Sequence, residues 1–262
     1  MNKNIFKISD QISIDEVEKI YEKNFEKIIY EFFNLEHEWM FNAYKEYKDF
    51  DKYLILIYLL HKTLETYNKH FYKVSFEKFY NNPHIEIEKI SIIDLVKSLS
   101  MSKETVRRKL NELSKEGVLT RKLKNIRINK VNSNARLERN VFNLSKLVFL
   151  LTSKLGKEHS LEDFSRLEIE KKIRNNYTQY WSLFFKFQIN YVLRCKNVYS
   201  SIENFYVWGL CAFNEALNSK KLSKSIKDNM FMETKDFHEN VTKLRNSKGL
   251  NPTTISELSG IP

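Results

Sequence analysis

Residues 91–117 read SIIDLVKSLSMSKETVRRKLNELSKEG, and this stretch decides the fold of the region around it. It opens with Ser91 three residues before Asp94, a spacing typical of a capping box at the start of a helix. Ser102 is placed to cap a second helix after a tight turn, and Gly117 stands where glycine commonly ends one. The stretch therefore predicts two short helices joined by a tight turn.

The second helix, over 103–115, carries Val106, Leu110 and Leu113 at positions i, i+4 and i+7. This spacing gives one apolar face that can pack on the apolar residues of the first helix. Residues 119–130 follow as two short runs of strand-forming residues, which predict a hairpin. A helix, a turn, a helix and a two-stranded ribbon together form the winged helix-turn-helix arrangement.

The opposite face of the second helix collects polar side chains that can read DNA bases. Arginine can bridge guanine O6 and N7, asparagine can pair with adenine, and glutamate can accept a hydrogen bond from cytosine. Basic residues on the hairpin stand where they can reach phosphates or a minor groove. The predicted DNA-binding residues are Ser102, Lys103, Glu104, Arg107, Arg108, Asn111 and Lys115 on the helix, and Arg121, Lys122, Lys124 and Arg127 on the hairpin.

The distribution of charge supports the same prediction. The chain carries 44 Lys and Arg against 33 Asp and Glu, a formal net charge of +11. Between Lys103 and Lys130 there are ten basic residues and three acidic ones, so most of the excess lies in this one segment. A local excess of this kind is what binding to phosphates requires.

Residues 102–110, SKETVRRKL, resemble the recognition helix of the Crp-type winged helix regulators, whose pattern is Arg-Glu-Thr-Val-x-Arg. The resemblance implies base-reading roles for Lys103, Glu104 and Arg108. Lysine stands at 103 where the family has arginine, and lysine binds as a point charge rather than through two parallel hydrogen bonds. MarR-like and GntR-like regulators share much of the pattern. The cyclic-nucleotide barrel of the Crp-type family would need many more glycines than the five of this chain, so its ligand is not expected here.

The rest of the chain predicts a mainly α fold. With five glycines and three prolines, it is too poor in turn residues for β-sandwiches, barrels or Gly-rich nucleotide folds. Two aromatic-rich stretches, 13–80 and 144–222, predict helices whose aromatic side chains form cores. Residues 50–60 are apolar nearly all round, so we expect them to be buried or to lie at a dimer contact. Residues 85–90 alternate with period two and predict a short strand or an extended lead-in, whereas 132–145 read as a polar connector.

The predicted organisation has four parts: an N-terminal helical region (1–82), the winged helix-turn-helix (83–131), a second helical region (132–235) and the truncated start of a second helix-turn-helix (236–262). The last part rests on the tail ISELSGIP, residues 255–262, which resembles the first helix and turn of a regulator's helix-turn-helix. An ordinary C-terminal helix is the alternative interpretation of this tail.

Several function classes lack their motifs. The six histidines form no His-Glu-x-x-His pair, and no P-loop or Gly-x-Ser-x-Gly elbow is present, so no enzyme activity, metal or cofactor is predicted. Cys195 and Cys211 are too few for a disulfide framework. The longest apolar runs are far shorter than a transmembrane helix needs, and Met1–Asp10 lacks the apolar core of a signal peptide. We therefore expect no membrane partner and a cytoplasmic location.

The sequence thus predicts a transcriptional regulator that binds double-stranded DNA, with helix 103–115 in the major groove and the hairpin 119–130 on phosphates. A plasmid- or phage-type replication initiator with two winged-helix units is one alternative. A protein-interaction adaptor that uses the winged helix as a docking surface is another. The aromatic-rich helices also offer a surface for a homodimer.

Overall fold

The computed structural model describes residues 13–82, 84–87, 90–122, 125–129, 134–159 and 164–222. The predicted second helix-turn-helix at 236–262 lies outside the described residues. The fold is mainly α with one small sheet, as predicted. Its elements are α1 (Ile14–Lys23), α2 (Phe25–Tyr47), α3 (Phe50–Lys69), α4 (Phe76–Tyr80), β1 (His84–Ile87), α5 (Ile92–Leu99), α6 (Lys103–Lys115), β2 (Leu119–Lys122), β3 (Asn125–Asn129), α7 (Asn134–His159), α8 (Arg166–Asn175), α9 (Tyr177–Tyr199) and α10 (Ile202–Leu222).

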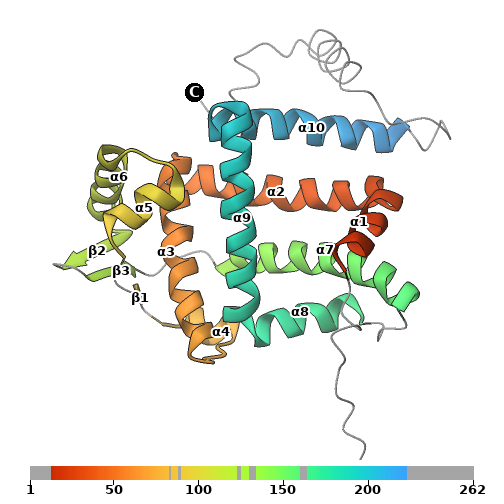
Figure 1. Cartoon of the computed structure of the whole chain (residues 1–262), viewed down its shortest axis with the longest axis horizontal. Coiled ribbons are helices and arrows are strands. Elements are labelled where there is room, and N and C mark those ends of the chain that lie inside the picture. Colours follow the sequence, from red (N-terminus) through yellow and green to blue (C-terminus); the bar gives the residue numbers. More distant parts are fainter. Residues whose placement is uncertain are drawn as a thin grey trace, which may run out of the picture.

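Helices α5 and α6 and the three strands form a winged unit at one end of the molecule (Figure 1). The sheet is antiparallel with strand order β1-β3-β2. Ile85 of β1 and Leu119 of β2 both stand opposite Ile128 of β3, so the central strand is β3. The predicted hairpin is confirmed, and the predicted lead-in pairs as a third strand.

Local hydrogen bonds fix the ends of α5 and α6 where the sequence predicts them. Ser91 Oγ accepts from the Asp94 backbone N–H at 3.1 Å, and the Asp94 carboxylate accepts from the Ser91 N–H at 3.0 Å. Ser100 ends α5 in the left-handed conformation, and Ser102 Oγ accepts from the N–H three residues later at 3.1 Å. Gly117 has φ +74° just after α6, a conformation that glycine adopts without a steric penalty. The capping box, the turn and the glycine stop are therefore confirmed.

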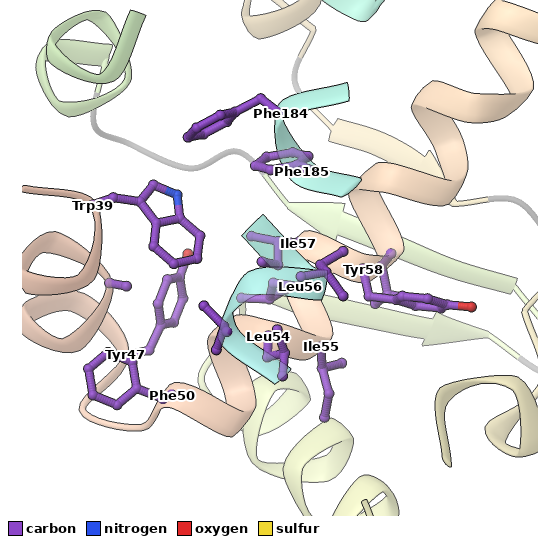
Figure 2. Close-up of a cluster of buried hydrophobic side chains, with 14 of the residues drawn as sticks. Trp39, Tyr47, Phe50, Leu54, Ile55, Leu56, Ile57, Tyr58, Phe184 and Phe185 are labelled. Atoms are coloured by element: carbon purple, nitrogen blue, oxygen red, sulfur yellow. The ribbon is translucent and has the colours of Figure 1, made fainter. Parts of the chain in front are cut away.

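Helix α3 is the element that joins the winged unit to the rest of the protein. It contacts β1, α5 and α6 on one side and packs along α9 on the other. Its residues 54–59 are all buried. Figure 2 shows Leu54, Ile55, Leu56, Ile57 and Tyr58 in one cluster with Trp39, Phe184 and Phe185. The expectation that 50–60 is buried is confirmed for 50, 52 and 54–59, and the other three residues are partly buried. A single hydrophobic core runs from the winged unit into the helical body, across the predicted domain boundary at 82.

The helical body is held together by aromatic side chains. Helix α2 packs on α7 and α10, and α9 runs alongside α3 and contacts α10 (Figure 1). Trp39, Tyr177 and Trp181 are almost fully buried, and the rings of Tyr177 and Trp181 stack with centroids 5.0 Å apart. The prediction that the aromatic stretches form cores is therefore confirmed.

The predicted polar connector at 132–145 is wrong over most of its length, because α7 begins at Asn134. Its apolar residues Leu137, Val141 and Leu144 follow the helical spacing i, i+4, i+7, and all three belong to or pack against the core. The charged and amide residues between them hide this pattern. The helical period at 137–144 was the signal that could have revealed the helix.

Other expectations from the sequence concern membranes, metals and disulfides. No helix in the described ranges is long and apolar enough to cross a bilayer. Within the same ranges, no three His, Cys, Asp or Glu side chains come together as a metal site. Cys195 and Cys211 are both free thiols.

Candidate nucleic-acid interface

Helix α6 is anchored by one apolar face. Val106, Leu110 and Leu113 are at most 1% exposed and pack with Leu95 and Leu99 of α5 in the shared core. The sequence places these residues together because they recur at the helical period. The face opposite to them is left to the solvent.

The exposed face of α6 carries six of the predicted binding residues. At 3.6 residues per turn these six span an arc of about 140° around the helix. Four are basic, one is acidic and one is an amide, so the face combines positive charge with groups that can read base edges. All of them are exposed: Lys103, Glu104, Arg107, Arg108, Asn111 and Lys115.

Ser102 has a structural role in this structure. Its Oγ accepts from the Thr105 N–H at 3.1 Å and lies 3.0 Å from the Thr105 hydroxyl. The hydroxyl therefore caps the first turn of α6. The N-terminus of a capped helix is also a favourable place for a phosphate, so Ser102 fixes the end of the helix that faces a DNA backbone in the predicted docking.

Arg108 has an internal partner. Its Nη1 lies 3.2 Å from Glu112 Oε1, one turn further along the helix, and its side chain is 60% exposed. Glu112 also contacts Lys109 and Lys52, each at 3.4 Å. Burial would raise the pKa of Glu112, but Lys109 and Lys52 outweigh that effect and hold it below its usual value. Glu112 thus has other cations to pair with when Arg108 turns toward a base.

Lys109 is a residue whose role the sequence did not show. It counts among the basic residues of the segment, yet it is only 7% exposed and its Nζ pairs with the carboxylate of Asp49, the N-cap of α3. A second ion pair, Lys52 Nζ to Glu116 Oε1 at 2.5 Å, ties α3 to the end of α6. Burial lowers the pKa of Lys52, but its contacts with Glu116 and Glu112 outweigh this and raise it. These contacts hold α6 firmly on α3.

The position of Lys109 on the helix was the available signal. It lies about 40° from Leu113, at the edge of the apolar face. The partner Asp49 is 60 residues earlier in the chain. Only the fold brings the two together.

The wing presents its basic residues on two different faces. Thr120 pairs with Arg127, and Leu119 with Ile128, so Arg121 lies on the sheet face of Leu119 and Arg127 on the other. Arg121 Nη1 donates to Asn111 Oδ1 of α6 at 3.2 Å, which links the wing to the exposed face of the helix.

Arg127 is turned away from α6 and forms an ion pair with Glu86 of β1 at 2.8 Å. The structure therefore brings Arg121 to the helix but does not bring Arg127 there. Lys122 lies in β2, but its side chain and the whole of Lys124 fall outside the described part of the chain.

This arrangement suits insertion into a groove of DNA. A helix about 12 Å wide across its side chains fits the major groove of B-DNA. Helix α6 lies at one end of the molecule in Figure 1, next to the hairpin, and its polar side chains are exposed. The hairpin can then reach the backbone next to the groove.

Comparison with protein families identifies this same segment. Residues 86–130 match the family described as DeoR-like helix-turn-helix domain, and the match contains α5, α6, β2 and β3. No curated protein and no solved structure matched the chain. The resemblance to the Crp-type family remains a prediction. Residues 86–130 are a DeoR-type helix-turn-helix domain, of the winged class found in transcriptional regulators.

Proposed function

We propose that this protein is a transcriptional regulator that binds double-stranded DNA sequence-specifically, with α6 in the major groove. The observation that carries the proposal is the exposed polar face of α6, which stands beside the wing in a DeoR-like domain. A protein with this role works in the cytoplasm, where it meets the DNA. The alternative roles of replication initiator and protein-binding adaptor have no observation in the structure that favours them.

Base reading falls to the exposed side chains of α6. Arg107 and Arg108 can each make a bidentate contact to guanine, which contributes about 1–3 kcal/mol of discrimination. Arg108 must first leave Glu112, and an exposed ion pair of this kind contributes only about 0–1 kcal/mol. Arg108 therefore gains more free energy from the contact to guanine than it loses by leaving Glu112. Lys103, Glu104 and Asn111 complete the reading face, and Asn111 releases Arg121 when it pairs with a base.

The residues around this face contact the phosphate backbone of the DNA in this proposal. Lys115 lies at the C-terminal end of α6, and Arg121 extends from β2 next to it. Lys122 and Lys124 belong to the same hairpin. Contacts of this kind fix the position of the protein on the duplex but do not distinguish sequences.

The experiment is a selection of bound duplexes from a random-sequence pool, followed by titration of the enriched site and of random DNA. We expect the wild-type protein to enrich a motif. Arg108→Ala should lower affinity for that motif by about 1–3 kcal/mol and affinity for random DNA much less, because base contacts specify the sequence.

Arg139→Ala is the matched control. Arg139 lies on α7 and is 61% exposed, and among the described residues it pairs with Glu38 at 3.4 Å, so it resembles Arg108 in exposure and pairing. Its replacement should leave the preference for the motif unchanged. A wild-type protein that enriches no motif would support the adaptor role instead. Equal losses on motif and random DNA for Arg108→Ala would remove the reading role of α6.

A further inference from the structure

Glu112 stands at the border between the exposed face of α6 and the side of the helix that packs on α3. It follows Arg108 by four residues, which places it one turn further along the helix and about 40° around it. Its side chain is 32% exposed. Glu112 is not among the residues predicted to contact DNA, but it touches one of them.

The two carboxylate oxygens of Glu112 have different partners. Oε2 lies 3.4 Å from Lys109 Nζ and 3.4 Å from Lys52 Nζ. The side chains of these lysines are only 9% and 10% exposed. Oε1 accepts a hydrogen bond from Arg108 Nη1 at 3.2 Å. The buried lysines therefore fix the carboxylate in place beside the guanidinium of Arg108.

This carboxylate is charged at pH 7. Burial raises the pKa of Glu112, but Lys109 and Lys52 outweigh that effect and hold it below its usual value. The exposed face of α6 therefore has a fixed negative charge at its edge, next to a side chain predicted to read a base.

A fixed negative charge distinguishes between the acceptors that DNA offers to an arginine. A phosphate group is anionic, whereas guanine O6 and N7 are neutral acceptors. A phosphate bound by Arg108 in its present position would stand roughly 4–6 Å from the carboxylate, and two like charges at that distance repel each other even in water. A guanine edge in the same position meets no such repulsion.

We propose that Glu112 is a specificity-determining residue of the DNA interface: its carboxylate, held by Lys52 and Lys109, repels phosphates from Arg108, so that this arginine binds a guanine edge instead. Glu112 acts through Arg108 and is a positioning residue. The inference rests on the proposed function, because it requires α6 to lie in the major groove. It also gives the helical body a part in recognition, because Lys52 belongs to α3.

The test measures the affinity of full-length variants for the selected motif and for random DNA at about 0.15 M salt. Glu112→Gln keeps the size of the side chain and can still accept a hydrogen bond from Arg108, but it has no charge. Affinity for random DNA should rise more than affinity for the motif, because only the phosphate contacts are freed from repulsion. The ratio of motif affinity to random affinity should fall about two- to fivefold, which corresponds to the repulsion of two unit charges at that separation in salt solution.

The glutamine variant should fold, because each lysine keeps another carboxylate. Lys109 still pairs with Asp49, and Lys52 still pairs with Glu116 at 2.5 Å. Circular dichroism checks the fold of every variant. Glu112→Ala is a second variant that removes the charge and places a strong helix former at this position. It should show the same loss of preference for the motif.

Glu116→Gln is the matched control. Glu116 caps the C-terminus of α6 and pairs with Lys52, but no contact with Arg108 is present among the described residues. Its replacement removes one negative charge from the same region, so it should change both affinities by similar factors and leave their ratio as in the wild-type protein. A second control is Glu112→Gln in the Arg108→Ala protein, where the ratio should not fall further.

A wild-type ratio in folded Glu112→Gln and Glu112→Ala proteins overturns the proposal, while the reading of DNA by α6 stands. An equal fall of the ratio in Glu116→Gln, or in the Arg108→Ala background, overturns it as well, because the effect then does not pass through Arg108. A wild-type protein that enriches no motif removes the proposed function and this inference together.

Discussion

Replacing Lys109 by methionine removes a charge that holds α6 on α3 and keeps the length of the side chain. Lys109 is 9% exposed at its side chain, and its partner Asp49 is 22% exposed. Asp49 also caps α3 by accepting from the Lys52 backbone N–H at 3.0 Å. The substitution therefore leaves a carboxylate that keeps its capping bond but loses its counter-ion.

The expected loss of stability follows from the burial of this pair. Removing one partner of a fully buried ion pair costs about 3–5 kcal/mol, and a surface pair contributes about 0–1 kcal/mol. Because Asp49 is partly reached by water, we expect Lys109→Met to lower the free energy of unfolding by about 2–3 kcal/mol. Asp49→Asn in the same chain removes the unpaired charge and keeps a good N-cap, so the double variant should recover about half of that loss.

Urea unfolding followed by circular dichroism measures these free energies for the wild-type protein, both single variants and the double variant. Lys196→Met is the control, because Lys196 pairs with Asp51 of α3 at 3.6 Å in a more exposed place. It should cost less than about 1 kcal/mol. If Lys109→Met costs no more than the control, or if the effects at 109 and 49 simply add, α6 is not held by this pair.

Three further predictions concern other parts of the molecule. Glu36→Gln should change the pH dependence of stability, because burial raises the pKa of Glu36 to about 8 and makes the native state bind the proton more tightly than the unfolded state does. The free energy of unfolding of the wild-type protein should therefore fall as pH rises from about 4.5 to about 8. Urea unfolding at pH 5, 7 and 9 should show the variant gaining up to ~5 kcal/mol relative to the wild-type protein. Lys122→Ala should weaken binding to every DNA sequence alike and reduce the salt slope by about 1, as measured by anisotropy at several salt concentrations. Leu110→Ala, at a fully buried position, should cost about 2–5 kcal/mol in thermal or urea unfolding, whereas Leu167→Ala, at a position 67% exposed, should cost almost nothing.

The sequence could predict those parts of the fold that depend on neighbours in the chain. The capping box at Ser91 and Asp94, the cap at Ser102 and the stop at Gly117 each rest on hydrogen bonds or backbone angles within a few residues. The exposed face of α6 follows from the helical period alone. These local signals agree with one another, which is why the winged unit could be recognised from about forty residues.

Contacts between distant parts of the chain were beyond the reach of the sequence pattern. Lys109 looked like one more basic residue of the segment, because nothing near it in the chain shows that Asp49 lies against it. The sequence predicts a DNA contact for Arg127 as for Arg121, but the strand register places Arg127 on the other face of the sheet, opposite Glu86. The buried carboxyl of Glu36 accepts a hydrogen bond from Gln188, which lies 152 residues away in the sequence, and no periodic pattern in the sequence predicts such a pair.

The start of α7 was missed for a different reason. The segment from 134 to 140 is dominated by polar residues, and polarity favours a connector in the absence of packing information. Its helix is stabilised by Val141 and its apolar neighbours against α2 and α8, so tertiary contacts override the local composition.

The central claim is that α6 reads base edges in the major groove, and methylation interference on the selected DNA site tests it most directly. Guanine N7 lies in the major groove and adenine N3 in the minor groove, so methylation at these atoms marks each groove separately. We predict that N7 methylation of one or more guanines blocks binding of the wild-type protein, and that Arg108→Ala loses sensitivity at one of them. Binding that is unaffected by N7 methylation at every guanine, but blocked by N3 methylation of adenines, would contradict the account.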